Sequence, residues 1–208
     1  MRLSHGDRDG MKNHTLKKYH IILASASPRR RFLLDGLGLT FDVQVPEVEE
    51  SYPSHLTREQ IPLFLAERKA LAYPATLLGE DVLVIAADTI VWLDGENLGK
   101  PEDHDAAVRM LRKLSGKRHE VITGVCLRSA KKMTSFFDVT AVYFKELPDE
   151  EIEYYVSRYR PYDKAGAYGA QEWIGYVGIA RVEGSYFNVM GLPVQRLYEE
   201  LMQFQTSL

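Results

Sequence analysis

The stretch ILASASPRR, residues 22–30, decides the fold because it joins an apolar run to the start of a helix. The apolar residues are typical of a buried β-strand. Ser27-Pro28 is typical of a helix N-terminus, with a capping hydroxyl before a proline in the first turn. A helix that begins directly after a strand presents free backbone N–H groups to an anion. The guanidinium groups of Arg29 and Arg30 favour phosphate as that anion, although the same residues also suit a plain cap followed by solvated arginines.

Extended and helical segments alternate after this unit, and the middle of the chain is rich in β-structure. The pattern predicts an amphipathic helix over residues 61–73, a strand covered on both faces over 81–88, and a hairpin with an Asp94-Gly95 turn over 89–101. Further helices are predicted after residues 101, 148 and 193, long strands over 119–129 and 134–147, and a glycine-rich loop before the last helix. We therefore predict an α/β fold, a single domain with a central mixed, twisted sheet flanked by helices around a cleft.

Composition narrows the class of protein. The chain has 208 residues, of which 45% are hydrophobic and 26% charged, and its net charge of −3 argues against a broad basic surface for duplex nucleic acid. Its one cysteine, Cys126, excludes an internal disulfide, and no apolar run is long enough to cross a bilayer. Residues 1–20 lack the apolar core of a signal peptide. We expect a flexible N-terminal leader over 1–20, a single domain over 21–208, and a cytoplasmic location.

Several polar residues stand in settings where a ligand can reach them. Asp88 is expected at the carboxyl end of the strand 81–88, where α/β proteins bind ligands, and its carboxylate can hold Mg²⁺ or act as a base toward water. The other candidates are Ser25 in the first turn, Glu50 in an acidic loop, the lysines Lys69, Lys100 and Lys164, and Gln171, whose amide can read the edge of a base. Taken one at a time, each also suits an ordinary cap or a solvated side chain.

Two histidines are candidate metal ligands by residue type. His104 and His119 belong to no His/Cys/Asp set with zinc spacing, so a solvated or capping role is predicted for both. The chain also lacks a GxxxxGK[ST] phosphate loop, a GxGxxG after a strand and a GxSxG nucleophile elbow. The commonest nucleotide-binding and hydrolase motifs are therefore absent.

Eight blocks occur in a characteristic order between residues 21 and 201, namely LASASPRRRFLL, VEES, AERKA, AADTIV, LGKP, LSGKRHEVITGV, DKAGAYGAQ and GSYFNVMGLPV. In this order they closely resemble the Maf family of nucleoside triphosphate pyrophosphatases. The resemblance implies a mixed α/β fold like that of the ITPase-like house-cleaning enzymes. It also implies hydrolysis of nucleoside triphosphates between the α and β phosphates with a divalent metal, Mg²⁺ or Mn²⁺, and suggests a homodimer.

The resemblance assigns roles residue by residue. Asp88 matches the proton acceptor of the family. The family's polar cleft residues correspond to Ser25, Arg30, Glu50, Lys69, Lys100 and Lys164. Glu50 and Asp88 are the residues expected to hold the metal. Whether Asp88 acts more as base or as metal ligand stays open, because a carboxylate suits both roles.

Three positions resemble the dTTP/UTP branch of the family: Arg29, Thr89 and Gln171. The branch acting on 7-methyl-GTP carries tryptophan, glutamine and glutamate there. The neutral amide of Gln171 can pair with the donor and acceptor edge of uracil or thymine. The expected substrates are dTTP and UTP, with modified uridine or cytidine triphosphates also accepted. The alternatives are a pyrophosphatase of the 7-methyl-GTP type and a non-catalytic nucleotide sensor that regulates septum formation.

Overall fold

The computed structural model describes residues 19–206, and the leader predicted for residues 1–20 lies almost wholly outside them. One sheet forms the centre of the molecule, with strand order β2-β1-β3-β5-β6-β7 and with β4 paired to β3. Its strands are β1 (His20–Leu23), β2 (Phe41–Val43), β3 (Val82–Leu93), β4 (Glu96–Leu98), β5 (Arg118–Arg128), β6 (Met133–Phe144) and β7 (Ile179–Glu183). Because β1 runs parallel to β2 and β3 while the other pairs are antiparallel, the predicted mixed sheet is confirmed.

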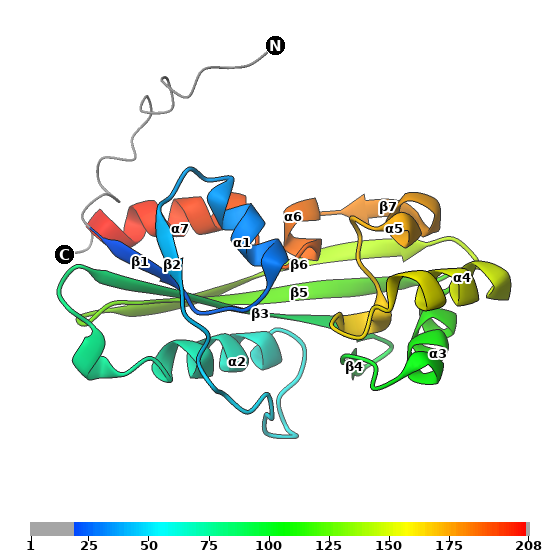
Figure 1. The fold of residues 1–208 in the computed structure, drawn as a ribbon, viewed down its shortest axis with the longest axis horizontal. Helices are drawn as coiled ribbons and strands as arrows, with labels where there is room; N and C mark the ends of the chain where they lie inside the picture. Colours follow the sequence, from blue (N-terminus) through cyan, green and yellow to red (C-terminus); the bar gives the residue numbers. More distant parts are fainter. Residues whose placement is uncertain (1–18, 207–208) are drawn as a thin grey trace, which may run out of the picture.

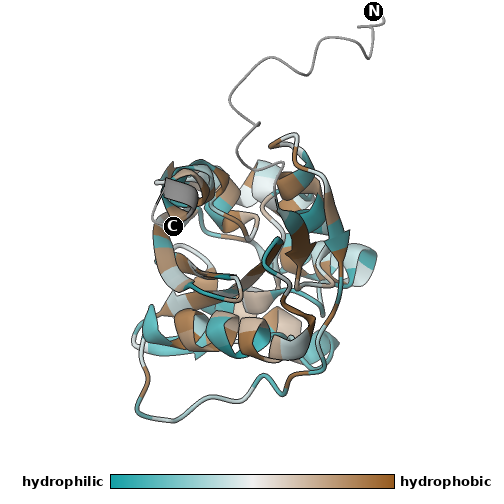
Figure 2. Cartoon of the chain, turned by 90° about the vertical axis from the view of Figure 1, so that its left-hand side faces the viewer, coloured by the Kyte–Doolittle hydropathy of each residue, from teal (hydrophilic) through white to brown (hydrophobic). Residues whose placement is uncertain are grey.

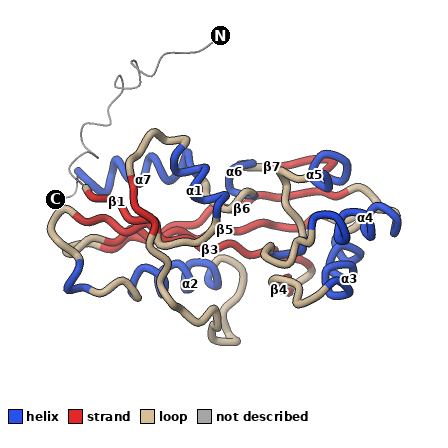
Figure 3. The backbone as a smooth tube through the Cα atoms, in the orientation of Figure 1, coloured by secondary structure: helices blue, strands red, loops and turns tan. Residues whose placement is uncertain are grey.

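Helices cover both faces of this sheet, with α1 and α7 on one face and α2 on the other (Figures 1 and 3). The helices are α1 (Pro28–Asp35), α2 (Gln60–Leu71), α3 (His104–Leu114), α4 (Asp149–Tyr159), α5 (Trp173–Gly178), α6 (Tyr186–Val189) and α7 (Val194–Thr206), with 3₁₀ turns η2 (Ala75–Leu77) and η3 (Ala165–Ala167). Hydrophobic residues concentrate between these layers (Figure 2). No helix within residues 19–206 is long and apolar enough to cross a membrane.

The central strand β3 distributes its side chains alternately to the two faces, as the twofold period of a strand requires. Leu83 and Ile85 pack in the cluster that contains α1 and α7, whereas Val84 and Ala86 pack against α2. The same alternation continues into the polar part of the strand.

Asp88 does not end a strand, contrary to the sequence prediction. It lies in the middle of β3, which continues without a break into the first arm of the predicted hairpin. The reason is tertiary: β5 pairs with β3 from Val84 to Trp92 and supports the strand beyond the aspartate. The Asp94-Gly95 turn that follows is confirmed, and both of its residues have positive φ.

A gap in the edge of β3 makes room for a ligand beside Asp88. The pairing of β1 with β3 ends at Ile85, and the pairing of β4 begins only at Val91. Between these two residues, this edge of β3 has no strand neighbour in the part of the chain that the structure describes. Ligand-sized space therefore opens at the carboxyl end of β1, not of β3.

The segment before the last helix was predicted to be a glycine-rich loop, and this prediction is wrong in part. It contains α5, β7 and α6, and β7 extends the sheet by pairing with the end of β6 from Ala141 to Phe144. These elements are only four to six residues long, so their own periodicity is too short to reveal them.

His119 is part of the core, which contradicts the solvated or capping role predicted for it. It is 1% exposed, its Nε2 lies 2.7 Å from the hydroxyl of Tyr168, and its ring packs edge-on against Phe144. Burial, with a smaller effect of the Arg118 charge, lowers the pKa of His119 to about 3. The imidazole is therefore neutral in the folded protein at pH values where it is protonated in the unfolded chain.

This difference predicts an acid-sensitive fold. As pH falls below 6.5, the unfolded chain takes up a proton at His119 that the folded protein does not, so stability falls. The loss reaches about 2 kcal/mol by about pH 5. Glutamine can keep the hydrogen bond to Tyr168 but does not titrate, so His119→Gln should show a flatter dependence of Tm on pH over this range. Thermal unfolding of the wild type and His119→Gln at several pH values measures this dependence. Parallel plots of Tm against pH for the two proteins would refute the prediction.

Candidate active site

A cleft of about 360 Å³ opens beside the gap in the edge of β3. The walls come from the turn between β1 and α1, from the loop before α2, and from the loop between α4 and α5. All ten residues predicted for the site line it, namely Ser25, Arg29, Arg30, Glu50, Lys69, Asp88, Thr89, Lys100, Lys164 and Gln171. The structure thus brings together residues that are spread over most of the chain.

The first wall is the strand–turn–helix unit predicted from residues 22–30. Ser27 caps α1 by accepting a hydrogen bond from the backbone N–H of Arg30 at 3.4 Å, and Pro28 is the first residue of the helix. Pro28 has no backbone N–H and that of Arg30 is used by the cap, so the turn offers an anion mainly the positive end of the helix dipole. Ser25, at the end of β1, is 8% exposed and lies in the same turn.

Arg30 is fixed by three hydrogen bonds from its guanidinium group. Nε donates to the carbonyl of Gly191 at 2.9 Å, and the two terminal nitrogens donate to Ser25 Oγ at 3.2 Å and to Thr89 Oγ1 at 3.0 Å. Burial lowers the pKa of Arg30, and the nearby charge of Asp88 opposes this effect. Since an arginine remains charged in either case, a fixed positive charge stands at the centre of the wall.

Thr89 is fully engaged with protein groups. Its hydroxyl accepts from Arg30 and is also hydrogen-bonded to Thr123 at 2.9 Å. It is adjacent to Asp88 on β3 but faces α1, whereas Asp88 faces α2. The structure therefore gives Thr89 a contact with Arg30, and its predicted part in choosing the base stays a prediction.

Two carboxylates and two lysines form a cluster at the opposite wall. Lys69 Nζ lies 2.6 Å from Asp88 Oδ1 and 3.0 Å from Glu50 Oε1, while Lys100 Nζ lies 2.8 Å from Glu50 Oε2. Partial burial alone would raise the pKa of Glu50, but the hydrogen bonds and charges of Lys100 and Lys69 outweigh it and lower the pKa to about 2. Glu50 is therefore ionised throughout the neutral range.

The donor set of this cluster is compatible with a divalent metal. Glu50 and Asp88 both contact the ammonium group of Lys69, at 3.0 Å and 2.6 Å, so the two carboxylates face the same part of the cleft. Among the described residues, no group of three or more His, Cys, Asp or Glu side chains could hold a metal ion. Two carboxylates suit Mg²⁺, which commonly takes one or two carboxylates and completes its shell with water and substrate phosphates.

The third wall is the loop of residues 163–172. Lys164 is 8% exposed and pairs with Asp163 at 2.7 Å, and the other oxygen of Asp163 lies 3.3 Å from Arg29 on α1. Asp163 therefore joins two walls of the cleft. Gln171 also lines the cleft, and its Oε1 is buried without a hydrogen-bond partner among the described residues.

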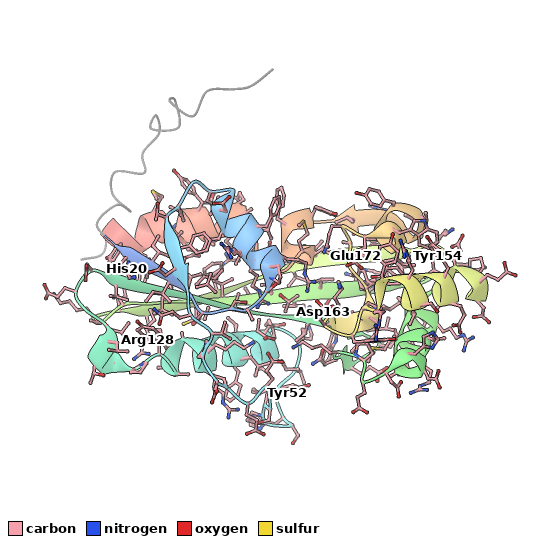
Figure 4. The ribbon with its side chains drawn as sticks, in the orientation of Figure 1. His20, Tyr52, Arg128, Tyr154, Asp163 and Glu172 are labelled. Carbon is pink, nitrogen blue, oxygen red and sulfur yellow. The ribbon has the colours of Figure 1, made fainter. Side chains whose placement is uncertain are left out.

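Three polar residues of this region were not singled out from the sequence: Asp163, Glu172 and Tyr155. Asp163 and Glu172 directly flank Lys164 and Gln171, and this adjacency was the available signal. Tyr155 occupies a core position of α4, where a tyrosine is indistinguishable from any other buried aromatic residue. Asp163 and Glu172 both lie between α1 and α4 in Figure 4, while His20 and Arg128 lie near the far end of the sheet.

Comparison with known proteins places the chain among close relatives. A family model described as Maf-like protein matches residues 20–204. A dTTP/UTP pyrophosphatase of Phocaeicola vulgatus is 59% identical over 187 residues, which are 89% of this chain and 96% of that protein. Proteins of the same description from Porphyromonas gingivalis and Flavobacterium johnsoniae are 54% and 49% identical, each over 92% of this chain and 98% of their own length. A solved structure, the Staphylococcus aureus Ham1 protein, matches with a TM-score of 0.42 and 19% identity over 60% of this chain and 71% of that chain.

Proposed function

The chain belongs to the Maf family, and we propose that it hydrolyses dTTP and UTP to the nucleoside monophosphate and pyrophosphate. The observation that carries the proposal is the cleft itself, in which cations from three walls surround two carboxylates. The relatives described as dTTP/UTP pyrophosphatases, with which the chain shares about half of its residues or more, support the choice of substrate.

The cations of the cleft bind the triphosphate. Arg30 is held in place for contact with phosphate oxygens, and the positive end of the α1 dipole lies beside it. Lys100 and Lys164 come from the other walls. Distributed in this way, the positive charges can neutralise the phosphates and stabilise the charge that develops on the leaving pyrophosphate.

Asp88 is proposed to take part in the attack of water. Water attacks the α-phosphorus, the bond from that phosphorus to the bridging oxygen breaks, and pyrophosphate leaves. As proton acceptor, Asp88 receives the proton of the attacking water. As metal ligands, Glu50 and Asp88 would hold Mg²⁺ or Mn²⁺, which supplies positive charge to the phosphates when bound. Both roles are consistent with a carboxylate that lies 2.6 Å from Lys69 Nζ.

Base selection is proposed to depend on Gln171, with Arg29 and Thr89 nearby. Gln171 lines the cleft, and its amide oxygen can accept from the N3–H of uracil or thymine while its amide nitrogen donates to a ring carbonyl. Two further proposals are a cytoplasmic location and a homodimeric state, the second of which the family resemblance suggests.

The test is pyrophosphate release from dTTP, UTP, CTP, GTP, ATP and 7-methyl-GTP with Mg²⁺ or Mn²⁺. We expect kcat/KM to be highest for dTTP and UTP, with the monophosphate as the other product, and to be lost when EDTA removes the metal. A higher kcat/KM for 7-methyl-GTP would identify the other branch. Release of orthophosphate and a nucleoside diphosphate would contradict the proposed bond. Tight nucleotide binding without turnover would indicate a sensor.

A further inference from the structure

The loop of residues 163–172 supplies two cleft residues, Lys164 and Gln171, although little of it is regular structure. Its only helical turn is η3, in which Gly166 and the non-glycine residue Ala167 both have positive φ, 69° and 60°. Such a loop has no helix or strand ladder to fix its course along its full length. Specific side-chain contacts must therefore determine where Lys164 and Gln171 lie.

Glu172 makes the first of these contacts from the end of the loop. Its Oε1 lies 3.1 Å from Lys164 Nζ, and the two side chains are only 20% and 9% exposed. Glycine at position 169 makes room for it, because a Cβ there would lie 2.8 Å from the carboxyl carbon of Glu172. Glu172 thus gives Lys164 a buried counter-charge, in addition to the more exposed Asp163.

Tyr155 makes the second contact from the core of α4. Its hydroxyl donates to Glu172 Oε2 and accepts a hydrogen bond from the backbone N–H of Gly169 at 3.0 Å. Burial, reinforced by the hydrogen bond and charge of Glu172, raises the pKa of Tyr155, so the phenol keeps its proton and remains a donor. One buried hydroxyl therefore binds the chain on both sides of Gln171.

We infer that Tyr155 and Glu172 are positioning residues, which hold the Lys164 ammonium and the Gln171 amide in the cleft. The inference rests on the proposed function, since it concerns how the same cleft binds triphosphate and base. The described contacts separate the two roles: Glu172 acts mainly on Lys164, and Tyr155 acts mainly on the segment that contains Gln171.

The consequence for base selection follows from the chemistry of an amide. A glutamine amide in one orientation complements uracil, and the same amide turned over complements cytosine. Gln171 therefore discriminates between the two bases only if its orientation is held. The hydroxyl of Tyr155 contacts Gly169 and Glu172 on either side of Gln171, and the restraint on the amide is inferred to come from this anchoring of the flanking chain.

The test compares kcat and KM on UTP and CTP for the wild type, Tyr155→Phe and Glu172→Gln. In Tyr155→Phe, we expect the ratio of kcat/KM for UTP over CTP to fall by about tenfold, the size of one lost hydrogen bond to a charged group. In Glu172→Gln, we expect kcat/KM to fall by about tenfold on both nucleotides, because Lys164 loses its buried counter-charge. Tyr159→Phe is the matched control, since Tyr159 is on the same helix and stacks on Tyr155 with ring centroids 5.0 Å apart.

The possible outcomes distinguish a failure of the proposed function from a failure of this inference alone. A wild type that hydrolyses neither UTP nor dTTP overturns the proposed function, and this inference with it. An active wild type whose UTP/CTP ratio is the same in Tyr155→Phe as in Tyr159→Phe overturns the inference alone. A lower Tm with an unchanged ratio in Tyr155→Phe reveals a merely structural role and overturns it as well.

Discussion

Replacing Asp88 with asparagine should lower kcat on UTP by about a thousandfold while UTP still binds. Asparagine has the same size, but it can neither take a proton from water nor balance the ammonium of Lys69, which lies 2.6 Å from Asp88 Oδ1. The cations that bind the phosphates remain in place, so the loss should fall on kcat rather than on nucleotide affinity. Pyrophosphate release and equilibrium binding of UTP measure the two quantities.

The control for this variant is Asp105→Asn, which removes a carboxylate that is 83% exposed on α3 and should behave as wild type. Binding of Mn²⁺, followed by electron paramagnetic resonance, separates the two roles of Asp88. If Asp88 is only the base, Asp88→Asn should bind Mn²⁺ as tightly as the wild type. If Asp88 is a metal ligand, the substitution should weaken Mn²⁺ binding. Near-normal turnover by Asp88→Asn would show that another residue is the proton acceptor.

The substitution Gly124→Ala should strongly lower the stability of the fold. Gly124 lies opposite Asp88 in the pairing of β5 with β3, and a Cβ there would lie 2.5 Å from backbone atoms of Pro62 and Leu63 at the start of α2. Backbone atoms cannot turn aside as a flexible side chain can, so the helix must move. We expect a loss of about 3 kcal/mol, or about 10 °C in Tm for a chain of this size.

Activity should fall with stability in this variant, because α2 also carries Lys69 into the cleft. Gly99→Ala is the matched control: a Cβ at Gly99, in the loop before Lys100, meets no atom within 4 Å. Thermal unfolding of the two variants beside the wild type measures the difference. Equal Tm values for Gly124→Ala and Gly99→Ala would show that α2 does not pack on the sheet as closely as described.

The elements with strong local signals were predictable. Ser27-Pro28 begins α1, Asp94-Gly95 makes the hairpin turn, and the spacing of apolar residues marks α3 and α7. These features depend on residues within a few positions of one another, so the sequence alone contains the information. The positions of the ten cleft residues in space depend on six separate parts of the fold, which no local pattern connects. They could be named from the sequence only because they belong to motifs that occur in a characteristic order.

The features that escaped prediction depend on distant partners. A charged residue after an apolar run is a common strand end, but β3 passes through Asp88 because β5 pairs with it on the other side. The short strand β7 exists because β6 offers it an edge. Tyr155 is connected to the cleft loop because its hydroxyl contacts Gly169 and Glu172 from the core, a contact that no spacing in the chain encodes.

The alternation of side chains along β3 constrains how such a chain can evolve. Asp88 meets Lys69 on one face of the sheet, and the next residue, Thr89, meets Arg30 on the other. A single-codon insertion or deletion in the preceding part of the strand would exchange the two faces, sending the carboxylate toward the arginine and the hydroxyl toward the lysine. Substitutions elsewhere on β3 change one contact at a time, whereas a change in length by one residue would break both. Selection should therefore preserve the length of this strand as strictly as the identity of its aspartate.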